Sequence, residues 1–170
     1  MDPKKLNMPL EGKDIAGLKA GDRVLLSGIM YTARDAAHLR GIPFDPKGQV
    51  IFYAGPTPGK NGRLIGSIGP TTASRMDPFM NELLGKGLAA SIGKGPRSTE
   101  VKKLHKKHKA VYFVATGGAA ALLARTVKKA EVFEYGDLGP EAVLKLDVFD
   151  FPAIVAYDIH GGDAFEKINN

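Results

Sequence analysis

The sequence predicts an α/β fold within a single domain. Apolar runs of strand length alternate along the chain with helical patterns, and glycines mark the joins between the two kinds of segment. The chain has 170 residues, close to the size of one domain, and contains no linker or internal repeat that would divide it. Its 21 glycines exceed the average share, so several turns are expected to need a positive φ or a close approach of backbone segments.

The elements are predicted in chain order from local patterns. Residues 1–20 are polar and are expected to form a lead-in segment that packs on the domain formed by residues 21–170. Runs of aliphatic and aromatic residues predict strands, and apolar residues at helical spacing predict helices. The first half thus contains a strand at 23–27 that 29–32 extends, a helix at 33–40, strands at 50–54 and 63–68, and a helix at 76–84. The second half contains a lysine-rich helix after Ser98, a strand at 110–115, a small-residue helix at 119–127, and strands at 131–135 and 153–157.

Most of the net charge of +6 is concentrated on the lysine-rich helix. Five lysines lie there within eight residues: Lys102, Lys103, Lys106, Lys107 and Lys109. Ser98 is a suitable N-cap, and Val101 and Leu104 are expected to face inward, which leaves the lysines in solvent. Because no aromatic residues alternate with the lysines, we interpret this surface as a solvated face and expect no nucleic-acid partner.

Several kinds of chemistry are excluded by residues that the chain lacks. It contains no cysteine, which removes disulfides, thiolate metal sites and cysteine nucleophiles. The glycine-rich stretch 87–95 is not a P-loop, because Gly95 stands where Ser or Thr should bind magnesium. His105 and His108 share a helix face, but in a lysine-rich helix both are expected to be solvated, and no metal site is predicted.

No targeting signal is predicted. No apolar run approaches the ~20 residues that a membrane span requires, so no membrane association is expected. The first ten residues contain lysines but no apolar segment behind them, which argues against a secretory signal. The sequence therefore predicts a cytoplasmic protein.

Cations and hydroxyls gather where predicted strands give way to helices or turns. The residues are Arg34, Thr71, Thr72, Arg75 and Lys94. The ends of strands are where ligands usually bind in α/β sheets, and Arg is the natural bidentate partner of a carboxylate. This pattern suits a small dianion. The alternative is that the two threonines only cap a helix and that Arg75 pairs with a surface acid.

The same motifs resemble a known family, the β subunit or C-terminal domain of class I iron–sulfur fumarases and related L(+)-tartrate dehydratases. The resemblance covers about residues 8–166. Its motifs lie at 8–10, 21–28, 32–38, 53–56, 69–76, 117–120 and 150–153. It implies that 21–170 form a fumarase C-terminal-type catalytic domain, a swivelling β/β/α domain. It also implies a separate α subunit whose three cysteines hold a [4Fe-4S] cluster, in an α2β2 assembly.

The resemblance implies a hydro-lyase that removes water reversibly from (S)-malate to give fumarate. By similarity to the family motifs, Arg34, Arg75 and Lys94 are expected to bind the substrate carboxylates, Thr71 to take the proton, and Thr72 to contact the substrate. Asp35 and His38 are expected to support these groups, and for His38 a purely structural hydrogen bond is the alternative. Two other functions stay open: dehydration of tartrate or another hydroxy-dicarboxylate, and a non-enzymatic module that binds polyanions through the lysine helix.

Overall fold

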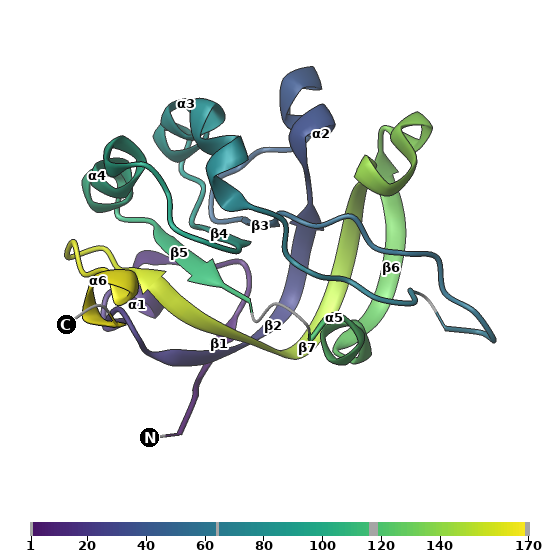
Figure 1. Ribbon diagram of the computed structural model, residues 1–170, viewed down its shortest axis with the longest axis horizontal. Helices are drawn as coiled ribbons and strands as arrows, with labels where there is room; N and C mark the ends of the chain where they lie inside the picture. The colour runs from purple at the N-terminus through teal and green to yellow at the C-terminus, as the bar shows by residue number, and fades with distance from the viewer. Residues whose placement is uncertain (1, 64, 116–118, 169–170) are drawn as a thin grey trace.

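A ring of five strands forms the centre of the structure. The computed structural model describes residues 2–63, 65–115 and 119–168. Strands β2 (Arg23–Thr32), β3 (Val50–Phe52), β4 (Ala90–Gly93) and β5 (Val111–Val114) run parallel to one another in this order. The long β7 (Val143–Tyr157) runs antiparallel to both β5 and β2 (Figure 1). β7 therefore closes the sheet on itself. Strand β1 (Lys4–Asn7) pairs in parallel with β2, and β6 (Val127–Glu134) pairs antiparallel with β7.

The helices are short and join these strands. They are α1 (Gly12–Ile15), α2 (Asp35–Arg40), α3 (Met80–Gly85), α4 (Thr99–His108), α5 (Ala120–Arg125) and α6 (Ala164–Ile168), with 3-10 helices η1 (Ala73–Phe79) and η2 (Gly136–Glu141). Helices α2, α3 and α4 stand together on one side of the strands, and α5 lies near the opposite end of the molecule (Figure 1). None of the helices in the described residues is long and apolar enough to cross a membrane.

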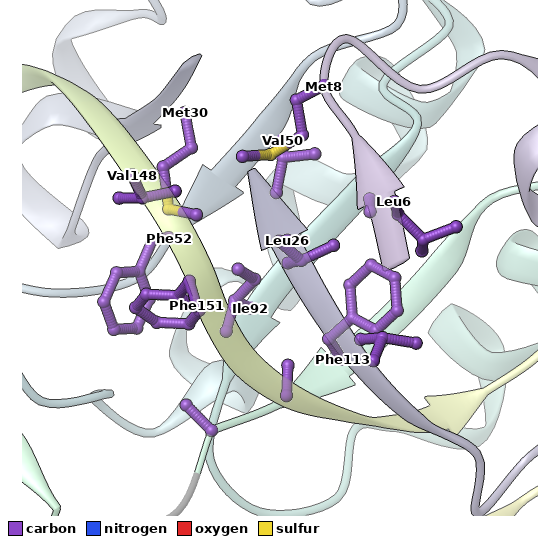
Figure 2. Close-up of a cluster of buried hydrophobic side chains, with 14 of the residues drawn as sticks. Leu6, Met8, Leu26, Met30, Val50, Phe52, Ile92, Phe113, Val148 and Phe151 are labelled. Atoms are coloured by element: carbon purple, nitrogen blue, oxygen red, sulfur yellow. The ribbon is translucent and has the colours of Figure 1, made fainter. Parts of the chain in front are cut away.

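The short strands β3, β4 and β5 are buried on both faces, which explains why their sequences are almost entirely apolar. Successive side chains point to opposite faces of a strand. In β3, Phe52 belongs to the cluster between the strands that Figure 2 shows together with Leu26 and Phe113. Its neighbours Ile51 and Tyr53 belong to a second cluster, which packs against the helices. This second cluster lies beneath the helices that carry the candidate site.

The α/β class is confirmed, and so are most of the predicted elements. The predicted strands at 23–32, 50–54, 110–115, 131–135 and 153–157 correspond to β2, β3, β5, β6 and β7. The predicted helices correspond to α2, to η1 followed by α3, to α4 and to α5. Ser98 is the N-cap of α4, and its Oγ accepts a hydrogen bond from the N–H of Val101 at 3.3 Å. Two residues of the resemblance motif at 117–120, Gly117 and Gly118, lie outside the described residues.

The predicted strand at 63–68 is wrong. The described residues of this stretch belong to no named strand. Ile65 forms only an isolated bridge with Pro58, and the N–H of Ile68 donates to the main-chain oxygen of Ala120 at 3.1 Å. Both isoleucines are buried, so their apolar character reflects the packing of a loop on the core rather than a place in the sheet.

Three strand segments were not predicted. The polar lead-in contains β1, in which only Leu6 is buried and the two lysines before it are exposed. The glycine-rich stretch that was compared with a P-loop contains β4, which is buried throughout. Residues 143–152 form the first two thirds of β7, because this strand crosses the whole sheet and pairs with three others.

The expectation that His105 is solvated is also wrong. Its side chain is fully buried beneath α4, near the rings of Tyr112 and Tyr157, and its Nδ1 donates to the main-chain oxygen of Ala110 at 3.3 Å. Burial, reinforced by the positive charge of Arg97, lowers its pKa to about 3. His105 shares its face of the helix with Val101, four residues earlier, so it lies on the inner side although lysines flank it in sequence.

Candidate active site

Parallel strands bring the predicted site segments to one edge of the sheet. Arg34 follows β2, Tyr53 follows β3 and Lys94 follows β4. These three strands are parallel neighbours, so their carboxyl ends lie side by side, and α2 stands at the end of β2 in Figure 1. The carboxyl edge of such a sheet is where α/β proteins usually bind ligands.

Residues 71–73 insert between the ends of β3 and β4. The N–H of Thr71 donates to the main-chain oxygen of Tyr53 at 2.7 Å, and the N–H of Lys94 donates to that of Thr71 at 3.1 Å. The N–H of Ala73 then donates to the main-chain oxygen of Lys94 at 3.0 Å. Thr72 is the N-cap of η1, yet its side chain makes no capping hydrogen bond. The alternative that the threonines only cap the helix is therefore wrong for Thr72.

This arrangement requires a glycine at the end of β4. A Cβ added to Gly93 would lie 2.9 Å from the Cβ of Ala73 and 2.9 Å from Cδ2 of Tyr53. Real Cβ atoms essentially never approach so closely. The missing side chain at Gly93 thus allows the threonine segment to pack directly on the strand ends.

Arg75 lies within reach of both Thr71 and an acid. Its Nε donates to Oδ1 of Asp35 at 3.0 Å, and its Nη1 donates to Oγ1 of Thr71 at 3.4 Å. The Arg75 side chain is 50% exposed, and that of Asp35 is 31% exposed. The alternative that Arg75 pairs with an acid is confirmed, and the acid is Asp35, which belongs to the same candidate site. The pair connects η1 to the start of α2.

Arg34 directly precedes Asp35, and its side chain packs against the backbone at Gly55. A Cβ added to Gly55 would lie 3.1 Å from Nη1 of Arg34 and 2.7 Å from the main-chain oxygen of Pro140. Nε of Arg34 lies 3.9 Å from Oε1 of Glu141, which also accepts a hydrogen bond from the N–H of Ala36 at 3.3 Å. Glu141 was not predicted, because it follows Ala36 by 105 residues and no local motif marks it.

His38 contacts the main chain of Arg34 rather than its side chain. Nδ1 of His38 donates to the main-chain oxygen of Arg34 at 2.8 Å. The ring is buried against Tyr53 and Phe79, and burial lowers the pKa of His38 below its ordinary value. The structural hydrogen bond is therefore present, and it fixes the first turn of α2 behind Arg34.

Three cations and two hydroxyls thus share this edge of the sheet. The cations are Arg34, Arg75 and Lys94, of which Lys94 is exposed and has no ion pair among the described residues. Two acids, Asp35 and Glu141, accompany the arginines. Hollows of about 330, 790 and 380 Å³ lie elsewhere, beside residues 56–63 and 65–67, and none of the three cations lines them. The site is an open cationic surface suited to carboxylates.

A metal cluster does not fit the residues of this chain. The sequence contains no cysteine, the usual ligand of iron–sulfur clusters. Among residues 2–63, 65–115 and 119–168, no group of three His, Cys, Asp or Glu side chains could hold a metal ion. The described residues therefore supply no ligand set for a metal cluster.

Comparison with known proteins identifies the class of domain that this fold and site define. The family described as "Fumarase C-terminus" matches residues 3–168. The match spans almost the whole chain, and the chain therefore belongs to this family.

The individual relatives are of two kinds. A protein of Methanocaldococcus jannaschii named "Putative L(+)-tartrate dehydratase subunit beta" is 42% identical, over 94% of this chain and 90% of that protein. The aerobic class I fumarate hydratase of Escherichia coli strain K12 is 37% identical over 96% of this chain, and mitochondrial fumarate hydratase 1 of Leishmania major is 39% identical over 86%. The chain spans about a third of the length of these fumarate hydratases.

Proposed function

We propose that this chain is the β subunit of a two-chain hydro-lyase that converts (S)-malate reversibly into fumarate and water. The observation that carries the proposal is the carboxyl edge of the sheet, where Arg75 contacts Thr71, Lys94 pairs with Thr71 through the backbone, and Arg34 follows the neighbouring strand β2. Relatives over the whole chain include fumarate hydratases, which supports the reaction class. The dianionic substrate requires fixed cations, and this surface supplies three.

The cations bind the two carboxylates and stabilise charge that develops during the reaction. When the proton leaves C3 of malate, negative charge builds on the neighbouring carboxylate. At a distance of 4 Å and an effective dielectric constant near 20, the attraction of one guanidinium stabilises such a charge by roughly 4 kcal/mol. Arg34 and Arg75 provide planar, bidentate donors, and Lys94 provides a mobile point charge.

Thr71 is the proposed acceptor of the C3 proton. A threonine hydroxyl is a poor base unless nearby positive charge lowers its pKa. Nη1 of Arg75 lies 3.4 Å from Oγ1 of Thr71, and it would stabilise a negative oxygen there. Asp35 accepts from the Nε of the same guanidinium and so sets its orientation. Thr72, the adjacent hydroxyl, is proposed to contact the substrate.

The remaining parts of the site are proposed to come from a partner. The cysteine-bearing α subunit would hold a [4Fe-4S] cluster and the acid that protonates the departing hydroxyl, in an α2β2 assembly. This division is supported by the absence of cysteine here and by the part of the fumarate hydratases that this chain does not span. The chain alone is then expected to fold without hydratase activity.

A second substrate is favoured by one observation. The relative that matches over 90% of its own length is named as a tartrate dehydratase subunit. The three cations recognise carboxylates in either substrate, and malate and tartrate differ only in a second hydroxyl. Anaerobic co-expression with the α subunit, followed by assays on malate, fumarate and tartrate, decides between them. Turnover of none of these would refute the proposed reaction.

Two neighbouring threonines provide a matched test of the proton acceptor. Thr71→Val removes the hydroxyl at nearly constant shape and is expected to lower kcat by about 10² to 10⁴ with little change in KM. Thr72→Val should act mainly on KM. Exchange of the C3 proton with solvent deuterium should stop only in the first variant. If Thr71→Val retains wild-type turnover and exchange, the base lies on the α subunit.

A further inference from the structure

A buried arginine connects the two loops that carry the proposed substrate-binding residues. Arg97 lies three residues after Lys94, between β4 and α4, and its side chain is fully buried. Its Nε donates to Oδ1 of Asp77 at 2.7 Å. Its Nη1 donates to the hydroxyl of Tyr53 at 3.0 Å and to Oγ of Ser91 at 3.2 Å. One guanidinium thus joins η1 to Tyr53 at the end of β3 and to Ser91 within β4.

Both carboxylate oxygens of Asp77 accept hydrogen bonds from the segment that contains Arg97 and Ser98. Its Oδ2 accepts a hydrogen bond from the N–H of Ser98 at 2.9 Å, while Oδ1 accepts from Arg97. Asp77 belongs to η1, two residues after Arg75. The position of η1, and with it the start of the Arg75 side chain, is therefore tied to the loop that begins at Lys94.

Tyr53 links the same cluster to the threonine segment. The guanidinium carbon of Arg97 lies 5.2 Å from the centre of the Tyr53 ring and 5.3 Å from that of Tyr112, which are cation–π distances. The main-chain oxygen of Tyr53 accepts the hydrogen bond from the N–H of Thr71. Arg97 is thus linked to Thr71 through Tyr53 and to Arg75 through Asp77 of the same helix. It is linked to Lys94 because both residues lie on the loop after β4.

Stability alone is a poor explanation for this cluster. Burying an ion pair costs desolvation that its attraction often only offsets, and apolar residues of similar volume frequently do as well. Nη2 of Arg97 is buried and has no hydrogen-bond partner among the described residues. Burial acts to lower the pKa of Arg97, but Tyr53 and Asp77 outweigh it and the pKa is raised, so the group stays charged. What the cluster provides is a defined geometry.

We propose that Arg97 is a positioning residue which sets the place of Arg75, through Asp77, and of Thr71, through Tyr53, relative to Lys94. Arg97 itself lies below the surface and does not touch substrate. The inference rests on the proposed function for the catalytic meaning of those three residues. Its structural part, the coupling of η1 to the loop after β4, can be measured independently of any activity.

The first test is amide hydrogen exchange of the full chain. Asp77→Asn replaces one carboxylate oxygen by an NH2 group, which cannot accept a hydrogen bond from Arg97 or from the N–H of Ser98. Arg97→Lys removes the guanidinium that donates to both Asp77 and Tyr53. Both are expected to speed exchange in peptides covering 70–80 and 93–97 at least tenfold. The control is Lys102→Gln on α4, which removes the ion pairs of Lys102 with Asp163 and Glu166 and should leave these peptides unchanged. Unchanged exchange in folded Asp77→Asn overturns the inference, even if Arg97→Lys does not fold.

The second test is kinetic and uses the complex with the α subunit. Asp77→Asn is expected to lower kcat/KM at least tenfold, mostly through KM, because Arg75 is displaced as a carboxylate ligand. Lys102→Gln should change kcat/KM less than about twofold. An active wild-type complex with normal kinetics in both variants overturns the positioning role. An inactive wild-type complex refutes the proposed function instead, and the exchange experiment still decides the coupling.

Discussion

Gly55→Ala is expected to damage the site through one misplaced atom. The added Cβ would lie 2.7 Å from the main-chain oxygen of Pro140, where ordinary contacts begin at 3.4 Å. The backbone near Gly55 or Pro140 must therefore move by about 0.7 Å, since a main-chain oxygen cannot rotate away as a side-chain end can. The same Cβ would lie 3.1 and 3.2 Å from Nη1 and Cδ of Arg34, so any shift also moves that guanidinium.

Two quantities should change, and each has a magnitude. Overpacking of this kind costs about 1–3 kcal/mol in the free energy of unfolding. A displacement near 1 Å of a group that positions substrate can cost about 10²-fold in rate, so kcat/KM should fall by about 10- to 100-fold. Unfolding in urea followed by far-UV circular dichroism measures the first. Kinetics of the reconstituted two-chain enzyme measure the second.

Gly17→Ala is the matched control. A Cβ at Gly17 meets nothing within 4 Å, and its backbone has no positive φ. This variant should unfold at the wild-type urea concentration or slightly above it, with unchanged kinetics. Wild-type stability in Gly55→Ala would refute the steric argument. A loss of stability with unchanged kcat/KM would show that Arg34 does not bind substrate from the observed position.

Three further predictions follow from the other contacts. Gly93→Ala should lower the free energy of unfolding by about 1–3 kcal/mol in urea titrations, because two close contacts must open; equal midpoints would contradict this. The pKa of His105 is lowered by burial to about 3, so the unfolded chain binds more protons below about pH 6.5, and stability should fall by about 2 kcal/mol from pH 7 to pH 5. His105→Gln should flatten that slope, and an unchanged slope would place the titrating group elsewhere. Replacing the exposed lysines of α4 by Gln should change turnover less than about tenfold, whereas tight, salt-resistant RNA binding by the wild type would favour a nucleic-acid module. The three lysines to replace are Lys103, Lys106 and Lys107.

Local patterns were enough to predict the elements whose burial is regular. β3 and β5 are recognised from sequence because both faces are buried, so every residue is apolar. The capped α4 is recognised because Ser98 and the spacing of its apolar residues act within a few residues of each other. β1 and β4 escape such analysis, because a four-residue strand among lysines or glycines has no distinctive pattern until its neighbours supply the hydrogen bonds.

For the candidate site, the sequence by itself determined which side chains are available. Arg34, Thr71, Arg75 and Lys94 were singled out because cations and hydroxyls follow predicted strands, and the family resemblance suggested roles for them. The family itself is also determined by sequence, since similarity extends over residues 3–168. None of these observations required coordinates.

Only the tertiary structure decided how those side chains are supported. The partner of Arg75 is Asp35, 40 residues away, and the partner of Asp77 is Arg97, 20 residues away. It is also tertiary packing that buries His105 among tyrosines despite its lysine neighbours. Sequence patterns report interactions within a turn of helix or along one strand. Contacts between segments depend instead on which strands pair and in what register, and only the folded chain settles that.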